Sequence, residues 1–250
     1  MDGIYFVVAM AGRGKRFADA GFTQPKYMIK AGVRTLFERA VFSLPLKLSA
    51  KILFIALREH EERFGLRAFI GSKLPSSSWE LVLLDEPTRG QAETVMAAVN
   101  MIPPAAALAV YNIDTAFSSS SLEARLSDPA ARRDGVIGAF KLKGADDKWS
   151  FARTDGSGSV LETAEKVRIS DNALTGFYHF SKASDFFEAA GSAVRGRETV
   201  RGEFYIAPLY NRLIASGRRF VLDLAEQLTP LGTPEDVASF GTRLSGRKEE

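Results

Sequence analysis

The sequence predicts a single Rossmann-like α/β domain over residues 1–245, with a mostly parallel mixed sheet and helices on both faces. Three observations indicate this fold class. Apolar runs alternate with helical patterns along the first half of the chain. These runs are continuously apolar, which is typical of strands that are covered on both faces. The chain has 250 residues, of which 46% are hydrophobic, so it is long enough to bury one sizeable core.

Four strands are predicted in the first half, with a helix after each of the first three. In the third helix, Ala92, Val95, Met96 and Val99 follow the i, i+3, i+4, i+7 spacing of one helical face. This alternation favours parallel strands joined by right-handed crossovers. The predicted strands are 4–11, 51–57, 80–85 and 107–112, and the predicted helices are 35–44, 58–70 and 90–102.

The second half is less regular, and we expect it to elaborate the same sheet. The glycines, serines and aspartate of 154–160 predict a hairpin turn. Thr233 and Pro234 are typical of a helix N-cap and first turn. The predicted strands are 135–142, 148–155, 173–180 and 217–224; the predicted helices are 183–191, 206–215 and 233–240; and residues 246–250 are predicted to be a polar tail.

Composition and charge exclude several classes of function. The formal net charge is only +3, from 33 basic and 30 acidic residues, and no long basic run is present, so a nucleic-acid partner is not expected. The absence of cysteine excludes disulfides, thiolate metal sites and a cysteine nucleophile, and it fits a reducing compartment. The apolar runs are too short for a transmembrane helix, and the N-terminus lacks the basic start of a signal peptide. We therefore expect a cytoplasmic protein without a membrane partner. We also expect His60 to be solvated on a charged helix face, and we assign no role to His179.

The loop after the first strand is the strongest local sign of chemistry. It places Gly12 and Gly14 directly before Lys15 and Arg16, and Lys26 follows a proline. Glycines let backbone N–H groups approach an anion, and arginine and lysine add full positive charges, so the loop suits a polyphosphate. The spacing fits neither a P-loop nor the dinucleotide fingerprint. Taken alone, the loop is equally compatible with a glycine-rich turn bearing solvated cations.

The longer stretch MAGRGKRFADAGFTQPKYMIKAGVRTLFERAV (10–41) resembles the opening of the sugar-phosphate nucleotidyltransferases, the nucleoside-diphosphate-sugar pyrophosphorylases. The shared pattern is Gly-x-Gly-x-Arg followed by Pro-Lys. The variant here resembles members from surface-polysaccharide biosynthesis. Further matches occur in the family's order along nearly the whole chain: EPTRGQAETV (86–95), YNIDTAF (111–117), ETAEKV (162–167), DNALTGFYHF (171–180) and LGTPEDVASF (231–240).

The resemblance implies a GT-A-like nucleotidyltransferase fold and transfer of a nucleoside monophosphate from an NTP to a sugar 1-phosphate, with release of pyrophosphate. It implies a nucleotide-binding half (1–120) and a sugar-phosphate-binding half (121–245). The implied catalytic residues are Arg16, Lys26 and Asp114; the nucleotide-binding residues are Ala11, Gly12, Gly14, Lys15, Glu86 and Gln91; and the sugar-phosphate-binding residues are Glu165, Lys166 and Gly176.

The implied cofactor is Mg²⁺, held by Asp114 at the end of an apolar strand. Magnesium prefers one or two carboxylates together with phosphate oxygens and water. The sequence departs from the family's pattern at two places: Ile113 replaces a frequent glycine, and Pro230 stands where many members have a second metal-binding aspartate. Asp223 is out of register with that position. We therefore expect a single protein carboxylate on the metal.

Several alternatives stay open at this point. Glu165 and Lys166 also fit an exposed ion pair, and Gly176 also fits a strand bulge. Glu86 would accept hydrogen bonds from base amino groups, which favours CTP or GTP slightly over UTP or dTTP. The rival functions are a cytidylyltransferase for a non-sugar acceptor such as phosphocholine, a nucleotide-sugar-dependent glycosyltransferase, and a catalytically weak NTP-binding homologue. A homo-oligomer is possible.

Overall fold

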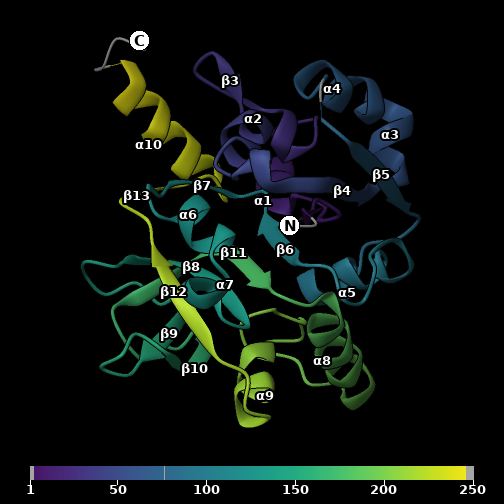
Figure 1. The fold of residues 1–250 in the computed structure, drawn as a ribbon. Coiled ribbons are helices and arrows are strands. Elements are labelled where there is room, and N and C mark those ends of the chain that lie inside the picture. The colour runs from purple at the N-terminus through teal and green to yellow at the C-terminus, as the bar shows by residue number, and fades with distance from the viewer. Residues whose placement is uncertain (1–2, 76, 246–250) are drawn as a thin grey trace.

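The computed structural model describes residues 3–75 and 77–245, and it confirms the predicted α/β class with a large mixed sheet (Figure 1). The predicted polar tail, 246–250, lies outside the described residues. The main sheet has nine strands, which come from both 1–120 and 121–245. The division of the chain into two functional halves stays a prediction.

The first half contributes four parallel strands in the order β5-β4-β1-β6. Next to β6 lies the antiparallel strand β11, which pairs on its other side with β8 and, at one position, with β9. Strand β12 is parallel to β8, and β10 is antiparallel to β9. The strands are β1 (Ile4–Ala9), β4 (Ser49–Leu57), β5 (Trp79–Leu84), β6 (Leu108–Asn112), β8 (Gly135–Lys141), β9 (Ser150–Thr154), β10 (Val160–Glu165), β11 (Asn172–Phe180) and β12 (Phe220–Leu224).

Both faces of the sheet are covered, which explains the continuous apolar runs. In β1, Val7 packs into the hydrophobic cluster on one face, while Phe6 and Val8 pack into the cluster on the other. The cluster containing Val7 also receives side chains from α5 (Gln91–Met96), α8 (Ala183–Gly196) and α9 (Leu209–Ala215). The opposite cluster receives side chains from α2 (Leu36–Val41), α4 (Leu66–Lys73) and α6 (Leu122–Ser127).

Two small ribbons and the C-terminal helix complete the fold around the start of the chain. β7 pairs with β13, and β2 pairs with β3. A third hydrophobic cluster joins Phe17, Ile29 and Leu231 to Val237 and Phe240 of α10, so this helix packs against the glycine-rich loop region. The elements are α1 (Lys15–Asp19), β2 (Lys30–Ala31), β3 (Arg34–Thr35), α3 (Arg58–Phe64), β7 (Thr115–Ser118), α7 (Pro129–Arg132), β13 (Gln227–Pro230), α10 (Pro234–Ser245) and the 3₁₀ turns η1 (Lys26–Met28), η2 (Leu46–Leu48) and η3 (Val99–Met101).

Several predicted boundaries were wrong. The helix predicted over 58–70 is two helices, α3 and α4, because Gly65 adopts a left-handed conformation with φ of 61°. The helix predicted over 90–102 ends at Met96 and is followed by η3. The helix predicted over 183–191 continues to Gly196, and the one predicted from residue 206 begins at Leu209.

His60 was predicted to be solvated, and this was wrong. It is buried, and its Nδ1 lies 2.9 Å from the hydroxyl of buried Tyr27, to which it is hydrogen-bonded. Burial lowers the pKa of His60 and raises that of Tyr27. The charged neighbours of His60 in α3 hid the fact that this position faces the protein interior.

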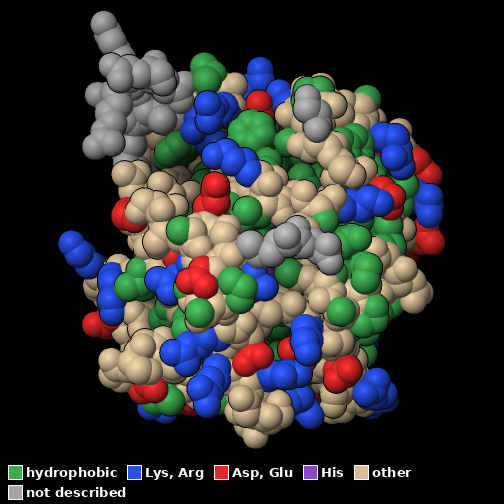
Figure 2. Space-filling view, viewed as in Figure 1, with side chains coloured by type: hydrophobic (Ala, Val, Ile, Leu, Met, Phe, Trp, Pro, Cys, Tyr) green, Lys and Arg blue, Asp and Glu red, His purple; other side chains and the backbone are tan. Residues whose placement is uncertain are grey.

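The face of the molecule in Figure 2 carries interspersed basic and acidic side chains with no continuous basic stripe, in keeping with the small net charge. Among the described residues, no helix combines the length and the apolar character that crossing a bilayer requires.

Removal of His179 is expected to make stability less dependent on pH. His179 is fully buried in β11, neither ring nitrogen has a hydrogen-bond partner among the described residues, and burial lowers its pKa to about 3. Below pH 6.5 the unfolded chain therefore binds a proton that the folded chain does not, and stability falls as pH falls. Between pH 6.5 and 5 this costs about 2 kcal/mol.

The measurement is urea unfolding of the wild type and His179→Leu at pH 7.5, 6.5 and 5. All other titratable groups are common to the two proteins, so their effect on the pH dependence cancels in the comparison. The free energy of unfolding of the variant is therefore expected to fall by about 2 kcal/mol less than that of the wild type between pH 6.5 and 5. Equal losses in the two proteins would contradict the prediction, whatever their absolute stabilities.

Candidate active site

The glycine-rich loop leads from the end of β1 into the short helix α1. Gly14 adopts the left-handed conformation, with φ of 63° and ψ of 34°, at the start of α1. Its carbonyl accepts hydrogen bonds from the N–H groups of Phe17 (2.9 Å) and Ala18 (3.2 Å). Phe17 is buried and anchors the helix. Gly14 is therefore needed for the turn itself.

Gly12 differs from Gly14 because the fold does not require it. A Cβ atom added at Gly12 would meet nothing within 4 Å, and its φ is not positive. Ala11 before it is buried, whereas Lys15 and Arg16 after it are exposed, and their side chains form no hydrogen bond or ion pair with any described residue. The loop thus presents bare backbone and two cations to open space, as an anion site requires.

Gly12→Ala is expected to lower kcat/KM for the NTP by about 10- to 100-fold while changing the free energy of unfolding by less than about 0.5 kcal/mol. The added methyl group fits the folded protein but occupies the space that we assign to phosphate. Steady-state kinetics and urea unfolding check the two parts. Gly156→Ala is the matched control, because its Cβ would also meet nothing within 4 Å and it lies in the β9–β10 hairpin. A fully active Gly12→Ala protein would contradict the assignment.

The structure brings together Lys26 and Asp114, which are distant in the sequence. Lys26 begins η1 after Pro25, and its Nζ lies 3.6 Å from Oδ2 of Asp114. The side chains are 18% and 38% exposed, respectively, so the pair is reached by solvent and does not lie in the core. The Cβ of Lys26 is 3.8 Å from the position a Cβ would take at Gly14. Lys26, the glycine loop and the strand-end carboxylate of Asp114 thus lie close together.

Asp114 occupies a firmly held turn at the carboxyl end of β6. Its carbonyl accepts a hydrogen bond from Leu231 N–H at 2.7 Å. The hydroxyl of buried Tyr111 donates to the carbonyl of Thr115 at 2.6 Å, and the Thr115 hydroxyl donates to the carbonyl of Thr175 at 2.7 Å. The carboxyl end of a parallel strand is where α/β sheets bind ligands.

The side chain of Asn112, two residues before Asp114, lies directly against the backbone of Gly176. Gly176 lies where the register of β11 against β8 shifts, and its φ is 89°. A Cβ at Gly176 would lie only 2.9 Å from Nδ2 of Asn112. The strand-bulge alternative for Gly176 is thus what the structure shows. Asn112 Oδ1 is buried without a hydrogen-bond partner among the described residues, so it is a site candidate that the sequence reading missed.

The base-side candidates lie on the loop that leads into α5. Gln91 opens this helix, and its Nε2 is buried without a partner among the described residues. The side chain of Glu86 is 83% exposed, and it lies 3.5 Å from Arg13 of the glycine loop. The predicted preference for CTP or GTP, which rested on Glu86, therefore gains no support.

Glu165 and Lys166 do not form the exposed ion pair that was one alternative. Glu165 is buried, its carboxylate accepts a hydrogen bond from Ser150, and burial raises its pKa. Lys166 has a left-handed φ of 55°; its Nζ donates to the hydroxyl of Tyr205 and lies 4.5 Å from that ring's centre. Ser150 is a further residue that the sequence reading missed.

Glu165 and Asp114 both act on the buried residue Tyr178. Burial raises the pKa of Tyr178 most, and the charges of Glu165 and Asp114 raise it further. Arg16 is close enough to Glu235 of α10 for its charge to act on that carboxylate. The pKa of Glu235 is lowered mainly by hydrogen bonds to its own backbone N–H and to Thr233, and the charge of Arg16 adds to this.

The residues around Asp114 fit a magnesium ion held largely by substrate oxygens. Asp223 is excluded as a ligand, since it is buried and accepts hydrogen bonds from Ser119 and Ser121. Pro230 pairs with Thr115 and offers no carboxylate. Among the described residues, no cluster of three or more acidic or histidine side chains could hold a metal. Of the three residues considered, Asp114 alone keeps a carboxylate available, and its role as the magnesium ligand stays a prediction.

The sequence matches no protein-family model and no curated protein. Among solved structures, the chain superposes with a TM-score of 0.81 on the nucleoside-diphosphate-sugar pyrophosphorylase from Vibrio cholerae RC9, with 35% sequence identity over 95% of this chain and 99% of that chain.

Two more distant structures share the fold alone. A Bacillus anthracis protein described as a glucose-1-phosphate thymidylyltransferase has a TM-score of 0.75 and 18% identity over 99% of this chain and 96% of that one. A UDP-glucose pyrophosphorylase complexed with UDP-glucose has a TM-score of 0.76 and 15% identity over 98% of this chain and 99% of that one.

Proposed function

Because the chain belongs to the nucleoside-diphosphate-sugar pyrophosphorylases, we propose that it transfers a nucleoside monophosphate from an NTP to a sugar 1-phosphate and releases pyrophosphate. The observation that carries this proposal is the 3.6 Å approach of Lys26 to Asp114 beside the open glycine loop. We further propose that the product serves surface-polysaccharide assembly and that the enzyme works in the cytoplasm, where both substrates are made.

In the proposed reaction, an oxygen of the sugar phosphate attacks the α-phosphorus of the NTP. A new O–P bond forms, the bond from the α-phosphorus to the bridging oxygen breaks, and that oxygen leaves with pyrophosphate. No enzyme-bound intermediate is needed. Catalysis then depends on holding two anions in line and neutralising their charge. We assign to Lys26, which lies beside Asp114, contacts with both the α-phosphate and the attacking phosphate.

We assign the leaving diphosphate to the glycine loop and Arg16. The backbone at Gly12 is open to a ligand, and the exposed side chain of Arg16 forms no hydrogen bond or ion pair among the described residues. Its planar guanidinium suits bidentate contact with phosphate oxygens. Charge that builds on the departing group is thereby stabilised at the loop's positive end.

Asp114 would hold Mg²⁺ through one carboxylate, with the remaining ligands coming from phosphate and water. When bound there, the ion supplies positive charge to the phosphates of the NTP. The chain's own contribution is to fix Asp114 on the turn between β6 and β7 and to keep Lys26 beside it.

For the base, we propose UTP or dTTP. The buried Nε2 of Gln91 is a free donor among the described residues, and uracil and thymine present carbonyl oxygens on an amide-like edge. The two distant structures of this fold are described as a thymidylyltransferase and as a protein bound to UDP-glucose, which supports the same choice.

The test is to incubate the protein with Mg²⁺, each of four NTPs and a panel of phosphorylated acceptors, and to detect pyrophosphate. The proposal expects pyrophosphate and an NDP-sugar, with UTP or dTTP preferred. Turnover with phosphocholine would instead support the cytidylyltransferase alternative. Release of NDP from a nucleotide sugar would support a glycosyltransferase, and NTP binding without turnover would support an inactive homologue.

A further inference from the structure

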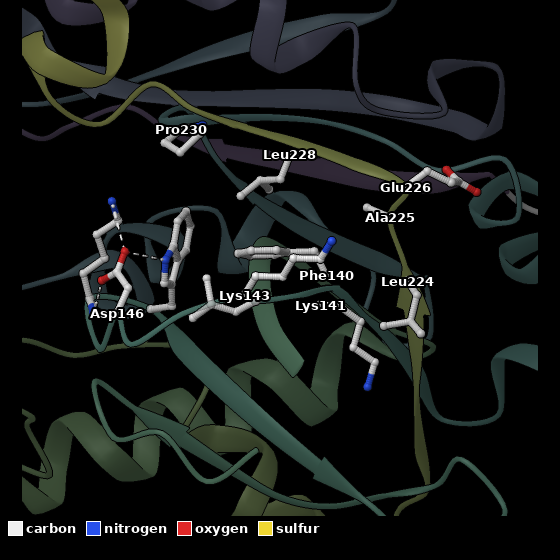
Figure 3. A pocket seen from close by; sticks show the side chains of 12 residues that line it. Phe140, Lys141, Lys143, Asp146, Leu224, Ala225, Glu226, Leu228 and Pro230 are labelled. Atoms are coloured by element: carbon white, nitrogen blue, oxygen red, sulfur yellow. Dashed lines mark hydrogen bonds and ion pairs between the residues drawn. The ribbon is translucent and has the colours of Figure 1, made fainter. Parts of the chain in front are cut away.

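A pocket of about 490 Å³ lies between the end of β8, the loop that follows it and the segment joining β12 to β13. One wall is aromatic: the rings of Phe140 and Trp149 meet edge to face at 5.0 Å. Leu224 and Leu228 line the other side (Figure 3). The volume suits a ligand of the size of a sugar or a nucleoside.

The pocket carries a surplus of positive charge. Its two acids are already engaged: Asp146 forms an ion pair with Lys148 at 3.4 Å, and Glu226 accepts a hydrogen bond from Ser120 at 2.6 Å. The side chains of Lys141 and Lys143, by contrast, form no hydrogen bond or ion pair within the described part of the chain. In Figure 3, Lys143 extends toward the middle of the pocket beside Phe140, and Lys141 lies at its open side near Leu224.

Residues that line the pocket are bonded to the segments that carry Lys166 and Asp114. The carbonyl of Trp149 accepts a hydrogen bond from Lys166 N–H at 3.0 Å, and the next residue, Ser150, donates to Glu165. On the opposite wall, Pro230 pairs with Thr115, which directly follows Asp114. A ligand placed between Asp114 and Lys166 therefore has this pocket as its neighbour.

We propose that the pocket binds a second acidic group, a carboxylate or a further phosphate, of the phosphorylated acceptor. The acceptor class is then an acidic sugar phosphate. This inference rests on the proposed function. Trp149 and Phe140 provide an apolar surface for a sugar ring, and Lys141 and Lys143 provide charges for the acid. The same two lysines would repel a cationic acceptor such as phosphocholine.

The experiment compares acidic and neutral acceptors with the double variant Lys141→Gln/Lys143→Gln. One pair is galacturonic acid 1-phosphate and galactose 1-phosphate, and the other is glucose 1,6-bisphosphate and glucose 1-phosphate. In the wild type, kcat/KM is expected to be about tenfold higher for at least one acidic acceptor than for its neutral partner. In the double variant this ratio is expected to fall to about one. Lys182→Gln, which removes an exposed lysine outside the pocket, is expected to keep the wild-type ratio.

A thermal-shift measurement with the same acceptors separates this inference from the proposed function. If an acidic acceptor stabilises the wild type more than its neutral partner does, and the double variant loses the difference, the pocket assignment stands even where no pyrophosphate forms. If pyrophosphate forms equally well with acidic and neutral acceptors in both proteins, the activity stands and the pocket assignment is overturned. The pocket assignment is also overturned if the extra stabilisation by the acidic acceptor is lost when NTP is added but is kept when a neutral sugar phosphate is added.

Discussion

Replacing Lys26 by methionine is expected to lower kcat by about 10²- to 10³-fold, which is the usual cost of removing one preorganised donor from a transition state. Methionine keeps the length and apolar stem of lysine but removes its charge. Lys26 is only 18% exposed and faces Asp114 at 3.6 Å, so water cannot easily replace it. Because the ammonium group is assigned to the phosphates during transfer, kcat is expected to fall more than the KM values rise. Single-turnover measurement of pyrophosphate release checks this.

Lys30→Met is the matched control. Lys30 is exposed in β2, only four residues further along, and it makes no contact with Asp114 in the structure. We expect it to retain the wild-type rate. The prediction would be contradicted by a Lys26→Met protein that turns over at the normal rate, or by one that loses activity only because it unfolds at the assay temperature. Urea unfolding of both variants distinguishes the second outcome.

The local sequence was enough to predict the strands that are buried along most of their length. Strands β1, β4 and β6 are buried along most of their length, so their composition alone marks them, and β4 and β6 lie within a residue or two of the prediction at each end. Lys26 and Asp114 were selected because each follows a strong local signal, a Pro-Lys turn and the end of a buried strand, and the structure places the two side chains 3.6 Å apart. Their catalytic roles stay a prediction.

The elements that were missed depend on contacts between distant parts of the chain. The ribbon of β7 and β13 joins residues more than 100 positions apart, and its four-residue strands have no apolar alternation to mark them. This ribbon fixes the turn that holds Asp114. His60 was misassigned for the same reason, because its burial is decided by Tyr27 and not by its charged neighbours in α3.

Contacts between distant parts of the chain also decided which site residues the sequence analysis missed. Ser150 lies in no motif, and Asn112 lies in the 111–117 match without having been singled out. Both became site candidates only when the structure placed Glu165 and Gly176 against them. Gly176 was predicted from its motif, but its conformational role was decided by the Asn112 side chain that occupies the space in front of it. A polar residue is recognised as part of a site by the residues that it contacts, and a single sequence does not show those contacts.

Replacing Asp114 by asparagine is expected to lower kcat by about 10²-fold or more and to weaken the binding of the divalent cation. Asparagine keeps the size and one oxygen of the side chain but removes the charge that magnesium prefers. The backbone hydrogen bond from Leu231 N–H is unaffected, so the turn is expected to keep its shape. Titration of Mn²⁺ by electron paramagnetic resonance, with a non-hydrolysable NTP analogue present, measures cation binding independently of turnover.

Asp171→Asn is the matched control, because Asp171 is exposed and its only partner in an ion pair among the described residues is Arg168. It is expected to bind Mn²⁺ as the wild type does. If Asp114→Asn also bound Mn²⁺ normally, the cation would have to use another carboxylate. Asp236 is the next candidate, since its Oδ2 and that of Asp114 each lie 3.9 Å from the Cβ position at Gly232. However, Asp236 already accepts a hydrogen bond from Thr233 N–H at the start of α10, and a ligand role would break this helix cap. A double variant at 114 and 236 that alone abolished binding would therefore move the metal toward α10 and overturn the assignment to Asp114.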